Sequence, residues 1–228
     1  MEHQDYEREL KYLLTKGGLT LEEILAKLVK YGYEVTRTPR NREKNETYYD
    51  TGKNEMLNRG DVLRHSEFKF TNADGQILTP TAFMYKRQMS NPQEPWVSKM
   101  ELGSGKYETI EQFLADLPDV KFDTPPQQIL TAQMQRYNTE IQKNGEQMHI
   151  TYDRVRYSKD GKTVTEDMLE LEDEHNRKDG HLHEVNDILL NSGLPLKLTK
   201  HSKYERGYRN LIKASVAQPL PCRDQPSP

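Results

Sequence analysis

The sequence has only one cysteine, few apolar residues and no long apolar run. The cysteine, Cys222, lies near the C-terminus, so the chain can form neither an internal disulfide nor a cysteine-based zinc site. Apolar residues make up 33% of the chain, and its mean hydropathy is −0.99. No stretch approaches the roughly 20 consecutive apolar residues that a membrane-spanning helix needs. These absences predict a protein of a reducing compartment, the cytoplasm, without a membrane partner.

An excess of charge of one sign is also lacking, because 33 basic residues balance 36 acidic ones and the net charge is −3. A chain this close to neutral is not expected to bind nucleic acid through a basic surface. Residues 1–16 carry charges throughout, unlike the apolar segment of a signal peptide. The 13 tyrosines and 5 phenylalanines, together with long periodic segments, favour a folded chain over a disordered one.

Apolar periodicity predicts an α+β domain built mostly from antiparallel hairpins. Thr20 and Glu23 form a capping box before an apolar stripe with helical spacing, so the first helix is expected there. Further helical segments are expected at 107–117, after Pro125-Pro126, and at 180–191. About eight strands are expected, drawn from the runs 6–14, 33–38, 45–50, 62–70, 80–88, 96–102, 131–142, 146–157 and 162–173. The domain is assigned to residues 1–213, and the proline-rich segment 214–228 is predicted to be a disordered tail.

Several of these strands carry charge on one face and apolar groups on the other. In the first strand, Glu7, Glu9 and Lys11 share a face. In a late strand, Glu170 and Glu172 share a face opposite two leucines. An ordinary antiparallel sheet with its polar face in water would show the same pattern. However, carboxylates stacked along a strand repel each other, and the amphipathic helices match the apolar faces. The pattern therefore also suits a sheet whose charged face is turned inward.

A charged interior has a chemical use. If the helices pack outside a curved sheet, about eight strands can close into a barrel with the charged face inside. Clustered carboxylates offer hard oxygen ligands for Mg²⁺ or Mn²⁺, and clustered Arg and Lys bind phosphate oxygens. Both together suit a polyanionic phosphate that is bound through metal. Isolated basic positions in strand-like segments are Arg64, Lys86, Arg136 and Lys203.

Five segments in a fixed order carry a recognisable pattern. They are Glu7-Arg8-Glu9-Leu10-Lys11, Tyr48-Tyr49-Asp50-Thr51 followed by Val62-Leu63-Arg64, Lys86, Leu169-Glu170-Leu171-Glu172, and Ser202-Lys203-Tyr204-Glu205-Arg206-Gly207. In this order they resemble the motifs of the CYTH superfamily, the triphosphate tunnel metalloenzymes. The resemblance covers nearly the whole chain. It implies an eight-stranded antiparallel barrel, a tunnel with helices packed outside, that binds a triphosphate and a divalent metal.

The resemblance also assigns roles to the charged residues. The expected metal ligands are Glu7, Glu9, Glu170 and Glu172, with Glu101 and Glu174 as further candidates. The expected phosphate-binding residues are Lys11, Arg64, Lys86, Arg136, Lys203 and Arg206. Arg64, Lys86 and Lys203 are the expected catalytic cations. The metal is expected to be Mg²⁺ or Mn²⁺, and the partner a small-molecule triphosphate bound by a monomer or homodimer.

Three functions are compatible with this resemblance. The leading hypothesis is metal-dependent hydrolysis of an inorganic, nucleoside or thiamine triphosphate. The second is a class IV adenylyl cyclase, which makes cyclic AMP and pyrophosphate from ATP. The third, non-catalytic binding of polyphosphate or nucleotide, is motivated by a thinner set of cations than the family usually has. Ser66 stands where the family often has a second arginine, and either Arg154 or Arg156 could replace a missing cation or lie on the surface.

Overall fold

The computed structural model describes most of the chain. The described residues are 3–71, 74–89, 94, 97–117, 120–173 and 179–216. Within these ranges, no side chain is described for 3–7, 97–101, 179–180 and 215–216.

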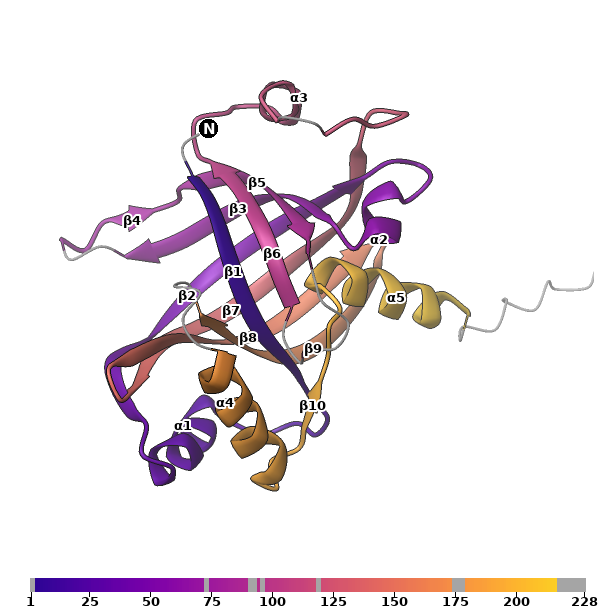
Figure 1. Ribbon diagram of the computed structural model, residues 1–228. Coiled ribbons are helices and arrows are strands. Elements are labelled where there is room, and N and C mark those ends of the chain that lie inside the picture. The colour runs from indigo at the N-terminus through magenta and orange to yellow at the C-terminus, as the bar shows by residue number, and fades with distance from the viewer. Residues whose placement is uncertain are drawn as a thin grey trace, which may run out of the picture.

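The described residues form an antiparallel sheet with helices around it, as Figure 1 shows. The strands are β1 (His3–Leu14), β2 (Glu34–Asp50), β3 (Val62–Thr71), β4 (Ile77–Leu78), β5 (Thr81–Gln88), β6 (Val97–Ser104), β7 (Gln127–Lys143), β8 (Glu146–Lys159), β9 (Lys162–Asp173) and β10 (Leu196–Leu198). The helices are α1 (Leu21–Lys30), α2 (Glu55–Arg59), α3 (Ile110–Ala115), α4 (Asp179–Asn191) and α5 (Lys203–Val216). The predicted α+β class is therefore confirmed. No helix in the described part of the chain is both long and apolar enough to cross a bilayer.

The strands lie in the order β10-β1-β6-β5-β3-β2-β7-β8-β9, and neighbouring strands in this order pair antiparallel. β1 also pairs with β9, so β1 has a neighbour along both of its edges. The sheet has ten strands instead of about eight. The difference comes from β4 and β10, which are only 2 and 3 residues long and too short to give a periodic signal. The predicted runs 33–38 and 45–50 merge into β2, whose pairing with β7 contains register shifts.

A first apolar core packs α1 and α4 against the sheet, and both helices lie together on one side of it in Figure 1. Leu10 and Tyr12 of β1 enter this core, while Glu9 and Lys11 belong to the opposite face. The Tyr12 hydroxyl donates to Asn186 Oδ1 at 3.0 Å, which ties β1 to α4. The predicted capping box of α1, between Thr20 and Glu23, is present.

The motif residue Asp50 organises the far end of the molecule. Its carboxylate accepts the backbone N–H groups of Met56 and Leu57 at 2.9 and 3.0 Å, which fixes the first turn of α2. It also accepts the hydroxyl of Tyr204 on α5 at 2.8 Å. Asp50 is fully buried, and these donors, together with the Thr51 N–H at 2.7 Å, satisfy a carboxylate that would otherwise be costly to bury. Its role in this fold is to join β2, α2 and α5.

The segment that contains Lys203 is a helix, although the sequence pattern favoured a strand there. The Ser202 hydroxyl accepts the Glu205 N–H at 3.1 Å, and this side-chain cap starts α5. The helix extends to Val216, so the first three residues of the predicted tail are helical. The rest of that tail, 217–228, lies outside the described residues.

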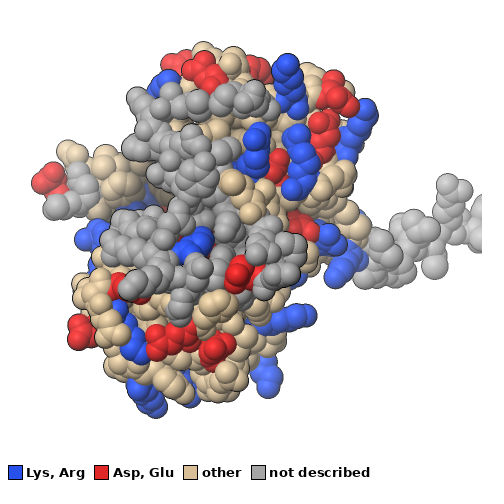
Figure 2. Space-filling view, in the orientation of Figure 1, with Lys and Arg blue, Asp and Glu red and all other residues tan. Residues whose placement is uncertain are grey.

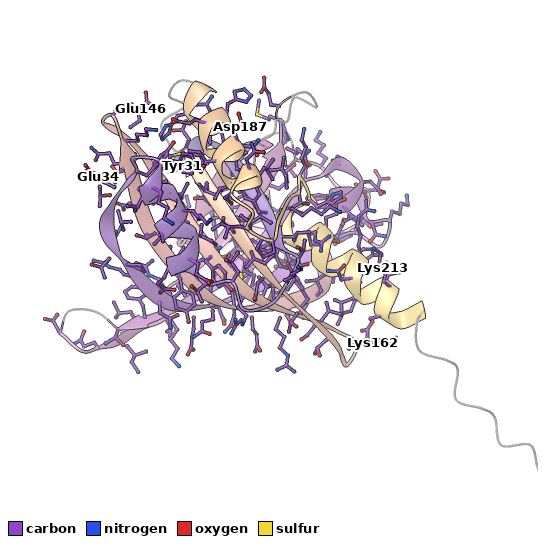
Figure 3. All side chains as sticks on the ribbon, turned by 90° about the horizontal axis from the view of Figure 1, so that it is seen from below. Tyr31, Glu34, Glu146, Lys162, Asp187 and Lys213 are labelled. Atoms are coloured by element: carbon purple, nitrogen blue, oxygen red, sulfur yellow. The ribbon has the colours of Figure 1, made fainter. Side chains whose placement is uncertain are left out.

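Other predicted boundaries also change. The predicted helix 107–117 shortens to α3, which is capped by the Thr109 side chain. β7 starts at Gln127, directly after Pro125-Pro126, so the helical turn predicted there is wrong. Figure 3 labels Glu146 and Lys162 at opposite ends of the β8 hairpins, and α5, which carries Lys213, lies toward the Lys162 end. The ammonium of Lys159 over the Tyr208 ring of α5, at 5.4 Å, confirms that neighbourhood.

The contact between α5 and β8 depends on a glycine. A Cβ added at Gly207 would lie 2.4 Å from the Tyr157 ring, which is fully buried. We predict that Gly207→Ala lowers the free energy of unfolding by about 1–3 kcal/mol through overpacking. Chemical denaturation measures this. Gly17→Ala is the matched control, because nothing lies within 4 Å of its added Cβ. Equal stability of the two variants would contradict this packing.

Candidate functional site

One cavity collects charged side chains from five strands and the start of α5. It is lined by Glu9, Lys11, Tyr48, Val62, Arg64, Lys86, Arg136, Glu170, Glu172, Ser202, Lys203 and Tyr204. Eight of these are residues that the sequence singled out as metal ligands or phosphate-binding cations. Segments far apart in the chain therefore meet here. On the outer surface, by contrast, basic and acidic side chains are interspersed over the described part of the face in Figure 2.

Strand register explains why the acidic residues meet. Across the β1–β9 pairing, Glu9 lies opposite Glu172 and Lys11 opposite Glu170. Directly opposite residues of an antiparallel pair point to the same face. Their sequence neighbours Leu10 and Leu171 consequently point to the other face, where α1 and α4 cover them.

Three carboxylates form a group that fits a divalent cation. Glu9, Glu170 and Glu172 each offer an oxygen, and these oxygens lie within 4.8 Å of one another. Glu9 and Glu170 are buried, at 2% and 4% exposure. Hard, negatively charged oxygen donors are what Mg²⁺ and Mn²⁺ prefer. The donor set therefore fits the expected metal.

Cations surround these carboxylates closely. The Lys11 ammonium lies 2.5 Å from Glu9, and Lys203 donates to Glu170. Arg136 lies 3.8 Å from Glu170. Burial alone would raise the pKa of Glu170, but Lys203, Lys11 and Arg136 outweigh burial and hold that pKa well below its usual value. The site thus keeps Glu170 charged beside these cations in a buried space.

Asp153 is a member of this charge cluster that the sequence reasoning missed. Arg136 donates to both of its carboxylate oxygens, at 2.8 and 2.7 Å, and Lys203 lies 3.0 Å away. Burial tends to raise the Asp153 pKa, whereas Arg136 and Lys203 lower it, and the net shift is downward. Arg154 and Arg156, which flank it, are exposed, and Arg154 pairs with Asp167 at 3.2 Å. Neither replaces a missing interior cation, and strand alternation from Glu170 across the β8–β9 pairing could have indicated Asp153 instead.

Lys44 and Glu46 on β2 were missed as well. They are 2% and 1% exposed, and their charged groups are 2.6 Å apart. Glu46 also binds Arg64, at 3.0 Å. The signal was present as a Lys-x-Glu alternation leading into the Tyr-Tyr-Asp-Thr motif. The predicted strand 45–50 begins between Lys44 and Glu46, so the alternation of these two residues was not followed.

The remaining predicted residues are not among the described residues that line the cavity. Arg206 lies on α5 and pairs with Glu166 at 2.7 Å, so the structure gives it a partner other than a substrate phosphate. The backbone of Glu7 pairs opposite Lys99, but its side chain lies outside the described ones, as does that of Glu101. Glu174 also lies outside the described residues.

Comparisons with known proteins agree with this fold. No family model matches the chain, and no curated protein matches it. Among solved structures, the PH1819 protein of Pyrococcus horikoshii matches with a TM-score of 0.55 and 17% identity, over 90% of this chain and 99% of that one. The Hippeastrum protein HpAC1, described as an adenylyl cyclase candidate with a dominant triphosphatase activity, matches with a TM-score of 0.51 and 12% identity. That match covers 90% of this chain and 96% of the Hippeastrum chain.

At these identities the likeness concerns the fold. The chain shares the fold of these proteins over almost its whole described length. This likeness of fold agrees with the resemblance that the ordered motifs carry.

The charge cluster predicts a marked loss of stability in acid. The pKa values of Glu170, Asp153 and Glu46 are all lowered in the folded chain. The folded state therefore binds fewer protons than the unfolded state. The stabilisation that these carboxylates provide is present when the pH is above the ordinary carboxyl pKa, and it is lost as the pH falls below that value. We expect the free energy of unfolding to fall steeply between about pH 5 and pH 2, as measured by denaturation at a series of pH values.

A variant separates this effect from general acid denaturation. Asp153→Asn should be less stable at pH 7 but should show a shallower decline in acid, because one buried proton-binding site is gone. Glu43→Gln is the control, since Glu43 is exposed on β2 and its side chain is 70% accessible. If Asp153→Asn and the wild type decline with the same slope, the buried pairing is not the source of the acid sensitivity.

Proposed function

We propose that the chain is a divalent-metal-dependent triphosphatase whose site lies inside an eight-stranded tunnel. The wall would consist of β1, β6, β5, β3, β2, β7, β8 and β9, and the pairing of β1 with β9 supports its closure. The observation that carries the proposal is the meeting of three carboxylates with five cations in one cavity. Neither group alone would suit a triphosphate, whereas both together match a phosphate chain that arrives with metal.

The roles follow from the chemistry of the side chains. Glu9, Glu170 and Glu172 would hold Mg²⁺ or Mn²⁺, with Glu7 as a further candidate ligand. The bound metal would supply charge neutralisation to the phosphate chain. Lys11, Arg64, Lys86, Arg136 and Lys203 would bind phosphate oxygens. Of these, we assign Arg64, Lys86 and Lys203 to the stabilisation of charge on the leaving diphosphate.

The present ion pairs favour joint binding of metal and triphosphate. Lys11 lies against Glu9, and Lys203 and Arg136 lie against Glu170. A phosphate chain alone would draw these cations away and leave carboxylates without counter-charge, while a metal alone would displace the cations. If both were bound, the carboxylates would hold the metal and the cations would hold the phosphates. The arrangement therefore supports a metal–triphosphate complex as the ligand.

Hydrolysis is favoured over cyclisation by one comparison. The Hippeastrum protein that shares this fold has a dominant triphosphatase activity. A cyclase would additionally need a pocket for the base and a way to place the ribose 3′-hydroxyl as nucleophile. We therefore place the class IV adenylyl cyclase and the binding-only protein among the outcomes of the test.

Product analysis tests the proposal directly. We expect the protein, incubated with Mg²⁺ or Mn²⁺ and either tripolyphosphate or ATP, to release orthophosphate and a diphosphate product, resolved by ion-exchange chromatography. Cyclic AMP with pyrophosphate would replace the proposal by the cyclase. Tight binding with no product would replace it by a binding protein.

Variants test the metal ligands in the same assay. Glu9→Gln and Glu172→Gln remove one charge each without changing side-chain volume, and we expect a rate loss of roughly 10–100-fold or more at limiting metal. Raising the metal concentration should recover part of the loss. Glu43→Gln, on the exposed side of β2, should retain the wild-type rate. If both cavity variants keep that rate at limiting metal, these carboxylates do not hold it.

A further inference from the structure

A buried trio of charges lies beside the cavity and has no assigned part in the proposed function. Lys44 and Glu46 are not among the described residues that line the cavity, yet both are almost fully buried. Arg64 lines the cavity and also reaches Glu46. The trio thus connects the cavity wall to a pair of charges behind it.

Glu46 is the centre of the trio. Its Oε1 lies 2.6 Å from the Lys44 ammonium and 3.0 Å from Arg64 Nη1. Its Oε2 accepts the hydroxyl of Tyr48. The Ser66 hydroxyl lies 3.5 Å from Oε1, because Glu46 and Ser66 are opposite each other in the β2–β3 pairing. A single carboxylate therefore receives two cations and two hydroxyls.

One carboxylate can balance only one of those two positive charges. Removing either cation would leave Glu46 to the other, and a buried ion pair attracts strongly because water is excluded. If Lys44 were absent, Glu46 would be left to Arg64 and would neutralise it. When Lys44 is present, it takes up part of the negative charge of Glu46, because its ammonium is the closer of the two cations to Oε1. Less of that charge is then left to neutralise Arg64.

We propose that Lys44 and Glu46 form a positioning pair for Arg64, in which Glu46 fixes the guanidinium and Lys44 balances Glu46, so that Arg64 keeps its positive charge for an anionic phosphate ligand. This inference rests on the proposed function of the cavity. It also gives a reason why Ser66 can stand where the family often has an arginine. Lys44, on the neighbouring strand, brings the second cation to the same place.

The surroundings make the charge of Lys44 dependent on pH. The charged and titratable groups around it are Glu46 and Tyr48 on β2, Arg64 on β3 and Arg136 on β7, and its ammonium also lies over the Phe68 ring at 4.8 Å. Burial, with the repulsion of Arg64, lowers the pKa of Lys44 to about 7, although Glu46 acts in the opposite direction. Lys44 is thus charged below about pH 7 and neutral well above it. Once it is neutral, Glu46 binds Arg64 alone and the cavity holds an anion less well.

The test is the affinity for tripolyphosphate in EDTA, measured by isothermal titration calorimetry between pH 6 and pH 9. Lys44→Met keeps the length of the side chain and removes its charge, and we expect roughly tenfold weaker binding than the wild type at pH 6. The difference should vanish by pH 9, where the wild-type lysine is itself neutral. Because the ligand's own ionisation is common to both proteins, the ratio of the two affinities reports Lys44 alone.

Two further variants sharpen the test. Lys69→Met removes a lysine from neighbouring β3, but Lys69 is exposed and pairs with Glu43, so its affinity should match the wild type at every pH. Lys44→Arg keeps a charge that does not titrate, so it should bind more tightly than the wild type at pH 9. Melting temperatures recorded beside the titrations show whether each variant is folded.

The outcomes separate this inference from the proposed function. A wild type that binds no tripolyphosphate at any pH, with Mg²⁺ added as well as in EDTA, would overturn both. A wild type that binds, with an affinity ratio to Lys44→Met that stays the same from pH 6 to pH 9, would overturn the positioning pair and leave the triphosphatase standing. A folded Lys44→Arg variant that binds tripolyphosphate no more tightly than the wild type at pH 9 would also overturn the positioning pair.

Discussion

The carboxylates buried in this sheet need counter-charges, and that constraint organises the molecule. Burying a carboxylate or an ammonium is costly unless an opposite charge and hydrogen bonds replace water. Glu170 meets this condition through Lys203 and Arg136, and Asp153 meets it through the same two cations. Because α5 delivers Lys203, the helix and the charged sheet face depend on each other. The apolar faces of the strands, turned outward, then provide the surface that α1 and α4 cover.

The sequence could predict the parts that depend on local patterns. Alternation placed Glu9 and Lys11 on one strand face and Glu170 and Glu172 on another, and register brings these faces together. The capping box at Thr20 marked the first helix because the signal lies within four residues. The order of the motifs supplied the cations of the other strands, and most of the predicted residues do line one cavity.

The sequence could not predict what depends on contacts between distant segments. Asp153 is 17 residues from Arg136 and 50 from Lys203 along the chain, and only the pairing of β7 with β8 and the docking of α5 bring them together. α5 itself was missed because its apolar face is completed by Tyr157 and other residues of the sheet interior. Arg206 was assigned to the ligand by its place in a motif, whereas Glu166 on β9 competes for it.

The proposed site depends on a buried set of cations that a polyanion can bind, and thermal melting with tripolyphosphate tests this binding most directly. A ligand bound only by the folded chain adds about 2.7 kcal/mol at a hundredfold excess over Kd. We predict that tripolyphosphate raises the melting temperature by several degrees, more than orthophosphate at equal ionic strength. Lys203→Ala should shrink the shift, and Lys30→Ala, at the exposed end of α1, should not. Equal shifts in the wild type and both variants would mean a generic anion effect and would contradict the charged cavity as the binding site.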